Sequence, residues 1–131
     1  MNILEHGEGI VYGNDGNIVY KGGFLNDKFE GNGEYFDEDR SHYVGQFHNS
    51  VANGKGILYN KSGDIIYEGD FVNGKFEGNG KCFKEDGKYY VGEFHNNSAN
   101  SKGILYDKDG KIIYEGIFIN DKYEEKNCII I

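Results

Sequence analysis

The sequence has 131 residues, which is the length of one domain at most. It contains 21 glycines, no proline and 15% aromatic residues. Its formal net charge of −8 excludes the basic footprint of a nucleic-acid-binding protein and weakens purely electrostatic binding to anionic lipid. No stretch approaches the roughly 18 apolar residues of a transmembrane helix, and the start, MNILEHGEG, lacks the regions of a secretory signal. We therefore expect a cytoplasmic protein.

A repeated pattern occupies most of the chain. Residues 6–19 match the second half of a unit, and the motif Tyr-x-Gly-x-Phe then recurs at intervals that alternate between 23 and 24 residues. The recurrence predicts one repeat domain over residues 1–127. Its expected parts are the half unit 6–19, the full units 20–42, 43–66, 67–89 and 90–113, and the partial unit 114–127.

Each unit reads as a β-hairpin. In the strand Tyr67–Phe71 the tyrosine, glycine and phenylalanine share one face, and Asn73-Gly74 is a strong two-residue turn signal. Folding about this turn predicts that Val72 faces Lys75, Phe71 faces Phe76, Gly69 faces Gly78 and Tyr67 faces Gly80. Aromatic rings are then expected to lie over the facing glycines and shield the backbone. Four-residue turns ending in glycine should join successive units, and DEDR (Asp37–Arg40), which lacks the glycine, is expected to be less regular.

Tyr-x-Gly-x-Phe, an Asn-containing turn and Gly-x-Gly together resemble the MORN (membrane occupation and recognition nexus) repeat, with phenylalanine in place of the usual tryptophan. The resemblance covers about residues 6–124 and implies an all-β fold, an elongated single-layer antiparallel meander of tandem β-hairpins with roughly ten strands. No helix-like pattern is available to cover its aromatic face. Either the sheet coils on itself or a partner covers that face.

The aromatic, glycine-floored face is the predicted site for a protein partner. It would serve a non-enzymatic scaffold, and the alternatives are a phospholipid-binding module, or a regulatory accessory domain of a larger enzyme. A homodimer is expected because the end strands and the aromatic face invite pairing, and because the resemblance implies it. The predicted partner-binding residues are Tyr20, Phe24, Tyr43, Phe47, Tyr67, Phe71, Tyr90, Phe94, Tyr114 and Phe118.

Other candidate sites have simpler interpretations, so we expect no catalytic residue, cofactor or metal. The Gly-x-Gly elements lie inside strand patterns and lack the following helix of a phosphate loop. The many carboxylates fall on turns or on the solvent face, and no calcium loop has the required spacing. His48 and His95 are expected at repeated surface turns, and Cys82 is expected in the core.

The last four residues, CIII, fit a C-a-a-X prenylation motif centred on Cys128. Its aliphatic last residue favours a geranylgeranyl group, and the motif would bring the protein to the cytoplasmic face of a membrane or cortex. The alternative interpretation of this tail, residues 128–131, is a final apolar strand that caps the stack.

Overall fold

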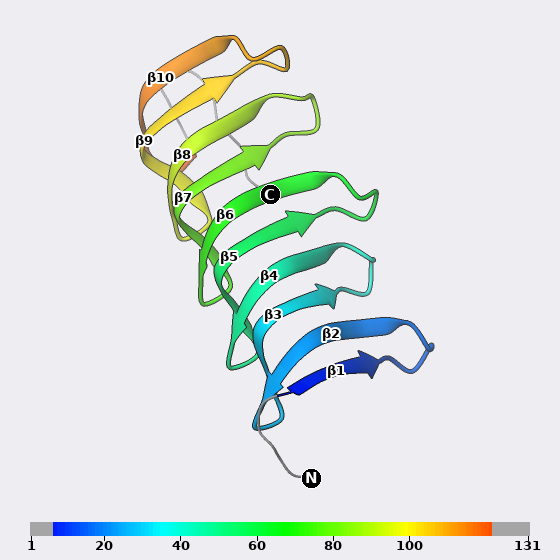
Figure 1. Cartoon of the computed structure of the whole chain (residues 1–131). Coiled ribbons are helices and arrows are strands. Elements are labelled where there is room, and N and C mark those ends of the chain that lie inside the picture. Colours follow the sequence, from blue (N-terminus) through cyan, green and yellow to red (C-terminus); the bar gives the residue numbers. More distant parts are fainter. Residues whose placement is uncertain (1–6, 122–131) are drawn as a thin grey trace.

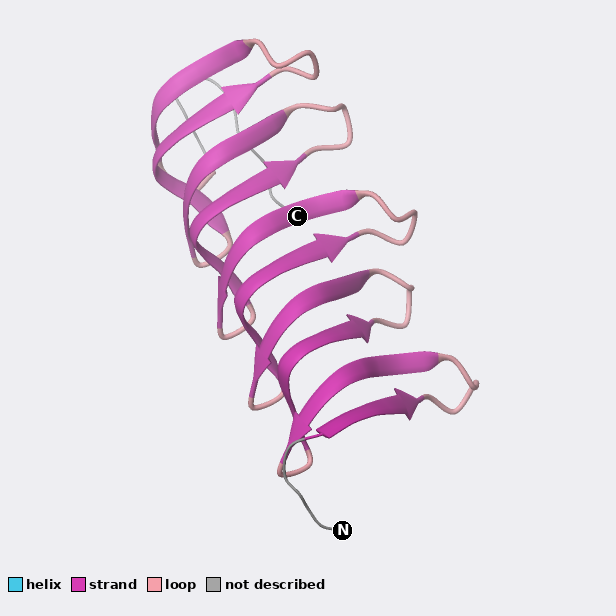
Figure 2. Cartoon of the chain, viewed as in Figure 1, coloured by secondary structure: helices cyan, strands magenta, loops and turns pink. Residues whose placement is uncertain are grey.

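The computed structural model describes residues 7–121, and these form ten antiparallel strands in one open sheet without any helix (Figures 1 and 2). Within this range, therefore, no helix is long and apolar enough to cross a membrane. Neighbours in the chain are neighbours in the sheet, so the all-β single-layer meander is confirmed. The strands are β1 (Gly7–Tyr12), β2 (Ile18–Leu25), β3 (Lys28–Phe36), β4 (His42–His48), β5 (Val51–Tyr59), β6 (Ile65–Val72), β7 (Lys75–Phe83), β8 (Tyr89–His95), β9 (Ser98–Tyr106) and β10 (Ile112–Phe118).

The sheet has two sides that carry different connections. Five-residue turns join β1 to β2 and each later odd strand to the next even strand, and we call this the turn side. Two-residue turns join β2 to β3 and each later even strand to the next odd strand, and we call this the hairpin side. Figure 2 shows both rows of turns along bent strands. The predicted tail with Cys128 lies outside the described residues.

A bulge in every hairpin bends the strands, and it corrects the predicted register. Phe71 does face Phe76, but Gly69 faces Gly80 and not Gly78, so Tyr67 faces Cys82. The reason is that three residues of β7 stand opposite one residue of β6 between these pairs. Gly78, at the centre of the three, has a φ of +78°, which a residue with a side chain adopts only with strain.

A second kind of bulge explains why the repeat spacing alternates. On the turn side of β6, Leu58 faces Tyr67 while Tyr59 faces Ile65, so Ile66 is an extra residue without a counterpart. Val19 in β2 holds the equivalent place, whereas β4 pairs with β3 without such a bulge. One bulge residue therefore accounts for the difference between 23 and 24 residues.

The turns follow the predicted chemistry with one exception. Asn73 and Gly74 both have positive φ, as the two-residue hairpin requires. The expectation that DEDR would be less regular is wrong. Arg40 takes the left-handed conformation with a φ of +71°, and the turn keeps the hydrogen bond from the N–H of Arg40 to the Asp37 carbonyl at 2.9 Å.

The core is built from tyrosines that lie over glycine pairs. The ring of Tyr67 covers Gly69 and Gly80, and a Cβ on either glycine would overlap it. The Tyr67 hydroxyl donates to the Asp70 carbonyl at 2.8 Å, which fixes the ring along its own strand. The same hydroxyl bond to the carbonyl three residues ahead recurs in all five units.

Candidate functional site

The predicted partner-binding face is mostly core. Eight of its ten residues are buried within the chain, and Tyr20, Tyr67 and Phe118 have no exposed surface. Phe24 and Tyr114, in the first and the last of the five Tyr-x-Gly-x-Phe motifs, are half-buried. The expectation that these rings are displayed to a partner therefore does not match their accessibility. The rings cover one another in a single buried cluster within the chain.

Packing between the rings is continuous from unit to unit. Tyr67 stacks on Phe76 with centroids 3.8 Å apart and meets Phe71 of its own unit edge-on at 5.1 Å. It also meets Phe94 of the next unit edge-on at 5.0 Å. Such geometry is favourable for aromatic pairs and ties neighbouring units together. The ten residues thus form the spine of the solenoid.

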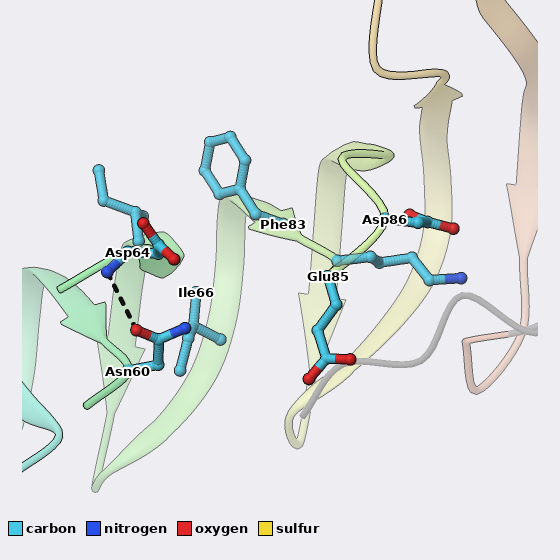
Figure 3. A pocket seen from close by; sticks show the side chains of 8 residues that line it. Asn60, Asp64, Ile66, Phe83, Glu85 and Asp86 are labelled. Atoms are coloured by element: carbon cyan, nitrogen blue, oxygen red, sulfur yellow. Dashed lines mark hydrogen bonds between the residues drawn. The ribbon is translucent and has the colours of Figure 1, made fainter. Parts of the chain in front are cut away.

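Two grooves of equivalent position open on the turn side. The first groove lies between the turns 13–17 and 37–41, and the second groove lies between the turns 60–64 and 84–88. Figure 3 shows the second groove, to which β6 and its preceding turn contribute Asn60, Asp64 and Ile66. Phe83, Glu85 and Asp86 come from the end of β7 and the turn that follows.

The grooves repeat because equivalent residues line them 47 positions apart. Each groove has a half-buried aliphatic bulge residue on one strand and a half-buried phenylalanine on the next. Acidic and amide side chains of the two turns line the rest. The equivalent pairs are Asn17 and Asp64, Val19 and Ile66, Phe36 and Phe83, Glu38 and Glu85, and Asp39 and Asp86.

The alternate gaps between turns are filled by stacked rings. Between β4 and β5, His42 stacks on Tyr59 with centroids 4.5 Å apart, and between β8 and β9, Tyr89 stacks on Tyr106 at 4.8 Å. At the grooves the even strand carries an aliphatic bulge residue such as Ile66 instead of a ring, so the gap is not filled. The bulge therefore produces both the spacing of the repeat and the position of the grooves.

The groove rims carry acidic side chains. The first groove is lined by four carboxylates and the Arg40 guanidinium, and the carboxylates are those of Asp15, Asp37, Glu38 and Asp39. The second groove is lined by Asp64, Glu85, Asp86 and Lys84, and the Lys88 ammonium lies 3.6 Å from Asp86 Oδ2. Hydrogen bonds from Ser41, through its hydroxyl at 2.6 Å and its N–H, lower the pKa of Asp39. The N–H of Lys88 lowers the pKa of Asp86 in the same way.

His48 and His95 lie at the surface of the hairpin side, as expected. His48 Nδ1 is 3.0 Å from Glu30 Oε2, and His95 Nδ1 is 2.7 Å from Glu77 Oε2. Within residues 7–121 no group of three metal-ligating side chains converges. Cys82 is buried in the core as predicted. The two histidine–glutamate pairs connect neighbouring hairpins.

The grooves are the feature that interpretation of the sequence missed. The available signals were the alternation of 23 and 24 residues and the recurrence of an aliphatic residue before each odd-numbered unit, such as Ile66 before Tyr67. Alternation of faces along a strand cannot assign such a residue, because a bulge residue has no partner to define its face.

Comparison with known families agrees with this architecture. The family model for the MORN repeat matches residues 20–41, 43–65, 67–89 and 90–112. No curated protein matches the chain. Because the four matches are consecutive and cover more than half of the sequence, the chain belongs to the MORN-repeat family.

Proposed function

We propose that the protein is a non-enzymatic protein-interaction module, a scaffold whose contact surface is the grooved turn side. The observation that carries this proposal is the pair of equivalent grooves 47 residues apart. Both have an apolar floor beside polar rims, which is the usual composition of a binding site. The membership in a repeat family is consistent with an interaction role or a membrane-binding role.

The burial of the ring row changes where a partner would bind. A partner cannot reach Tyr67 or Phe94 without unfolding the unit, because both side chains are enclosed by their own sheet. The same rings make the solenoid rigid, and a rigid array holds exposed features at fixed spacing. In the proposed scaffold, the buried rings keep the repeats rigid and the grooves make the contact with the partner.

Site-specific photo-crosslinking in the native cell tests this function. A photoreactive residue replaces Glu85 at the second groove, and the matched control replaces Val72, which is 47% exposed on the hairpin side. We expect protein adducts from position 85 and none from position 72. If neither position yields a protein adduct, the protein is not an interaction module of this kind.

Liposome sedimentation separates the proposal from a phospholipid-binding role. The purified protein, without lipid modification, should stay in the supernatant with both neutral and anionic vesicles, because its net charge of −8 opposes binding to anionic headgroups. Tight sedimentation with anionic vesicles would favour the lipid-binding role instead.

The CIII motif supports membrane attachment as a second candidate function. A prenyl group on Cys128 would bring the scaffold to the cytoplasmic face of a membrane, and one chain alone anchors only weakly. Intact mass of the protein from its native cell, together with cell fractionation of Cys128→Ser, tests this. An unmodified mass in a chain that ends at Ile131, or a variant that fractionates like the wild type, would contradict it.

A further inference from the structure

We infer that the two grooves together bind one extended protein segment that carries a basic and apolar triplet twice, about six residues apart. This inference rests on the proposed function and names the class of partner. Its basis is the repeated pairing of an apolar floor with an acidic rim at two fixed places on one side of the sheet.

The apolar lining of each groove can receive an apolar side chain of a partner. Ile65 and Ile66 of β6 and Phe83 of β7 provide the apolar lining of the second groove, and Figure 3 shows Ile66 and Phe83. All three side chains are half-buried, so an inserted leucine or isoleucine would remove their remaining apolar surface from water. In the first groove Val19 and Phe36 provide the same surface.

The rims select positive charge beside that apolar side chain. Four carboxylates oppose one guanidinium at the first groove, and that guanidinium belongs to Arg40, which already lies 4.7 Å over the ring of Phe36 and donates to the Ile18 carbonyl. Three carboxylates line the second groove beside Lys84, and one of them, Asp86, is already paired with the Lys88 ammonium at 3.6 Å. The Lys81 ammonium lies 5.1 Å over the ring of Phe83, so the excess of negative charge is smaller here than at the first groove. Arginine or lysine on both sides of the apolar residue would therefore be attracted, and an acidic segment would be repelled.

One partner segment can occupy both grooves only if it is extended between them. The first groove lies at β2 and β3 and the second at β6 and β7, four strands further on. Strands lie about 4.8 Å apart, so the grooves are about 19 Å apart, and an extended chain covers that distance in about six residues. Linking two weak contacts in this way raises the overall affinity without a new contact.

The probe is a synthetic peptide with two Arg-Leu-Arg triplets whose leucines are six residues apart. Nuclear magnetic resonance titration should shift the signals of Val19, Phe36, Ile66 and Phe83 together, and saturate. A peptide with one triplet should shift the same signals with an affinity about 10- to 100-fold weaker. Control peptides carry Glu-Leu-Glu triplets, or leucines only three residues apart.

Charge reversal at equivalent rim positions tests the role of the grooves. Glu38→Lys or Glu85→Lys should each reduce the affinity for the two-triplet peptide to that of the single-triplet peptide. The double variant should remove saturable binding. Asp109→Lys is the matched control, because Asp109 is an exposed turn residue of the same charge that lines neither groove.

Several results would overturn the inference. They are equal affinity for one and two triplets, equal binding by the double variant and the wild type, or no saturable binding of the peptide. If photo-crosslinking at position 85 captures a protein while the basic peptide does not bind, the interaction role stands and this class of partner is wrong. If neither occurs, the proposed function fails as well.

Discussion

At the scale of single residues, the tyrosine and glycine of each unit act as a pair. The backbones at Gly69 and Gly80 approach so closely that no side chain fits, and the Tyr67 ring fills the space that remains. The hydroxyl then satisfies the Asp70 carbonyl next to the bulge, at 2.8 Å. The tyrosine therefore stabilises the bulge, both by packing over its glycines and by the hydrogen bond of its hydroxyl.

Removing that hydroxyl should destabilise the fold. Tyr67→Phe keeps the ring but leaves the Asp70 carbonyl without its donor, and we expect the free energy of unfolding to fall by about 1–3 kcal/mol in urea titration. Tyr89→Phe is the control, because its ring stacks on Tyr106 on the turn side and its hydroxyl makes no hydrogen bond within residues 7–121. A loss no larger than that of Tyr89→Phe would show that ring packing alone supports the unit.

Burial of the same hydroxyls predicts sensitivity to alkali. Burial raises the pKa of Tyr20 and of Tyr43 to about 12 and also raises that of Tyr67. Because a folded-state pKa above the unfolded value of about 10 favours the protonated form, this stability is present below pH 10 and is lost as the pH rises to about 12. Tyrosinate absorbance and circular dichroism should change together in this range. Tyrosinate that appears while the sheet stays intact would contradict the burial.

Among the four hairpins within residues 7–121, Ser101 is the one place where the bulge lacks its glycine. It has a φ of +80°, close to those of Gly31 and Gly78 at equivalent positions. Ser101→Gly removes about 1–2 kcal/mol of strain and adds less than 1 kcal/mol of unfolded-state entropy, so we expect a net gain of about 0.5–1 kcal/mol in urea titration. Ser101→Ala retains Cβ and should give no gain. Equal gains from both would rule out strain as the cause.

At the scale of elements, each hairpin is attached to the one before it. The N–H of Asn97 donates to the Phe76 carbonyl, and the Asn97 side chain accepts from the N–H of Phe76 at 2.8 Å. Asp121 makes the same pair of bonds with Ala99, at 2.8 and 2.6 Å. Consecutive hairpins thus form a second line of backbone contacts on the hairpin side.

The carboxylate of Asp121 should be a weak point in this line. Burial raises its pKa, which means that the folded state favours the protonated form. The corresponding stability is complete below the unfolded pKa of about 3.8 and is lost as the pH rises through the folded pKa. Asp121→Asn keeps the acceptor, as in Asn97, without the charge.

We therefore expect Asp121→Asn to raise the melting temperature at neutral pH and to have little effect at about pH 3. Thermal unfolding at both pH values measures the difference, with Asp109→Asn as the control on an exposed turn. A gain that is independent of pH would exclude desolvation of the carboxylate as its cause.

The sequence was sufficient to predict the strands and turns but not the bulges. Asn73-Gly74 and the recurring Tyr-x-Gly-x-Phe motif report local preferences, which repeat in every unit and so reinforce one another. The register of Gly69 depends instead on a three-against-one bulge that also pairs with the following strand. That non-local geometry also buries the ring row and opens the grooves, so accessibility was the part that sequence interpretation missed.

At the scale of the whole molecule, β1 and β10 are the two end strands of the described sheet, and both carry exposed apolar side chains. Ile10 and Tyr12 on β1 are 47% and 60% exposed, and Ile112 and Ile117 on β10 are 56% and 52% exposed. Even strands pair with odd strands throughout the sheet, so β10 of one copy and β1 of another continue the same alternation. In that register Gly116 faces Gly9 of the second copy, as Gly92 faces Gly103 within the chain.

We expect head-to-tail association through these strands, which light scattering at micromolar concentration would show as a mass above 14.8 kDa that rises with concentration. Ile10→Glu should return the mass to that of one chain. In the joint the new carboxylate would face Glu115 of the neighbouring copy, whereas within its own chain it faces Lys21 and is tolerated. Val72→Glu is the matched control, since Val72 is also 47% exposed and also faces a lysine, Lys75, but lies on an interior hairpin. A constant mass of 14.8 kDa for the wild type, or equal effects of the two variants, would show that the end strands do not pair.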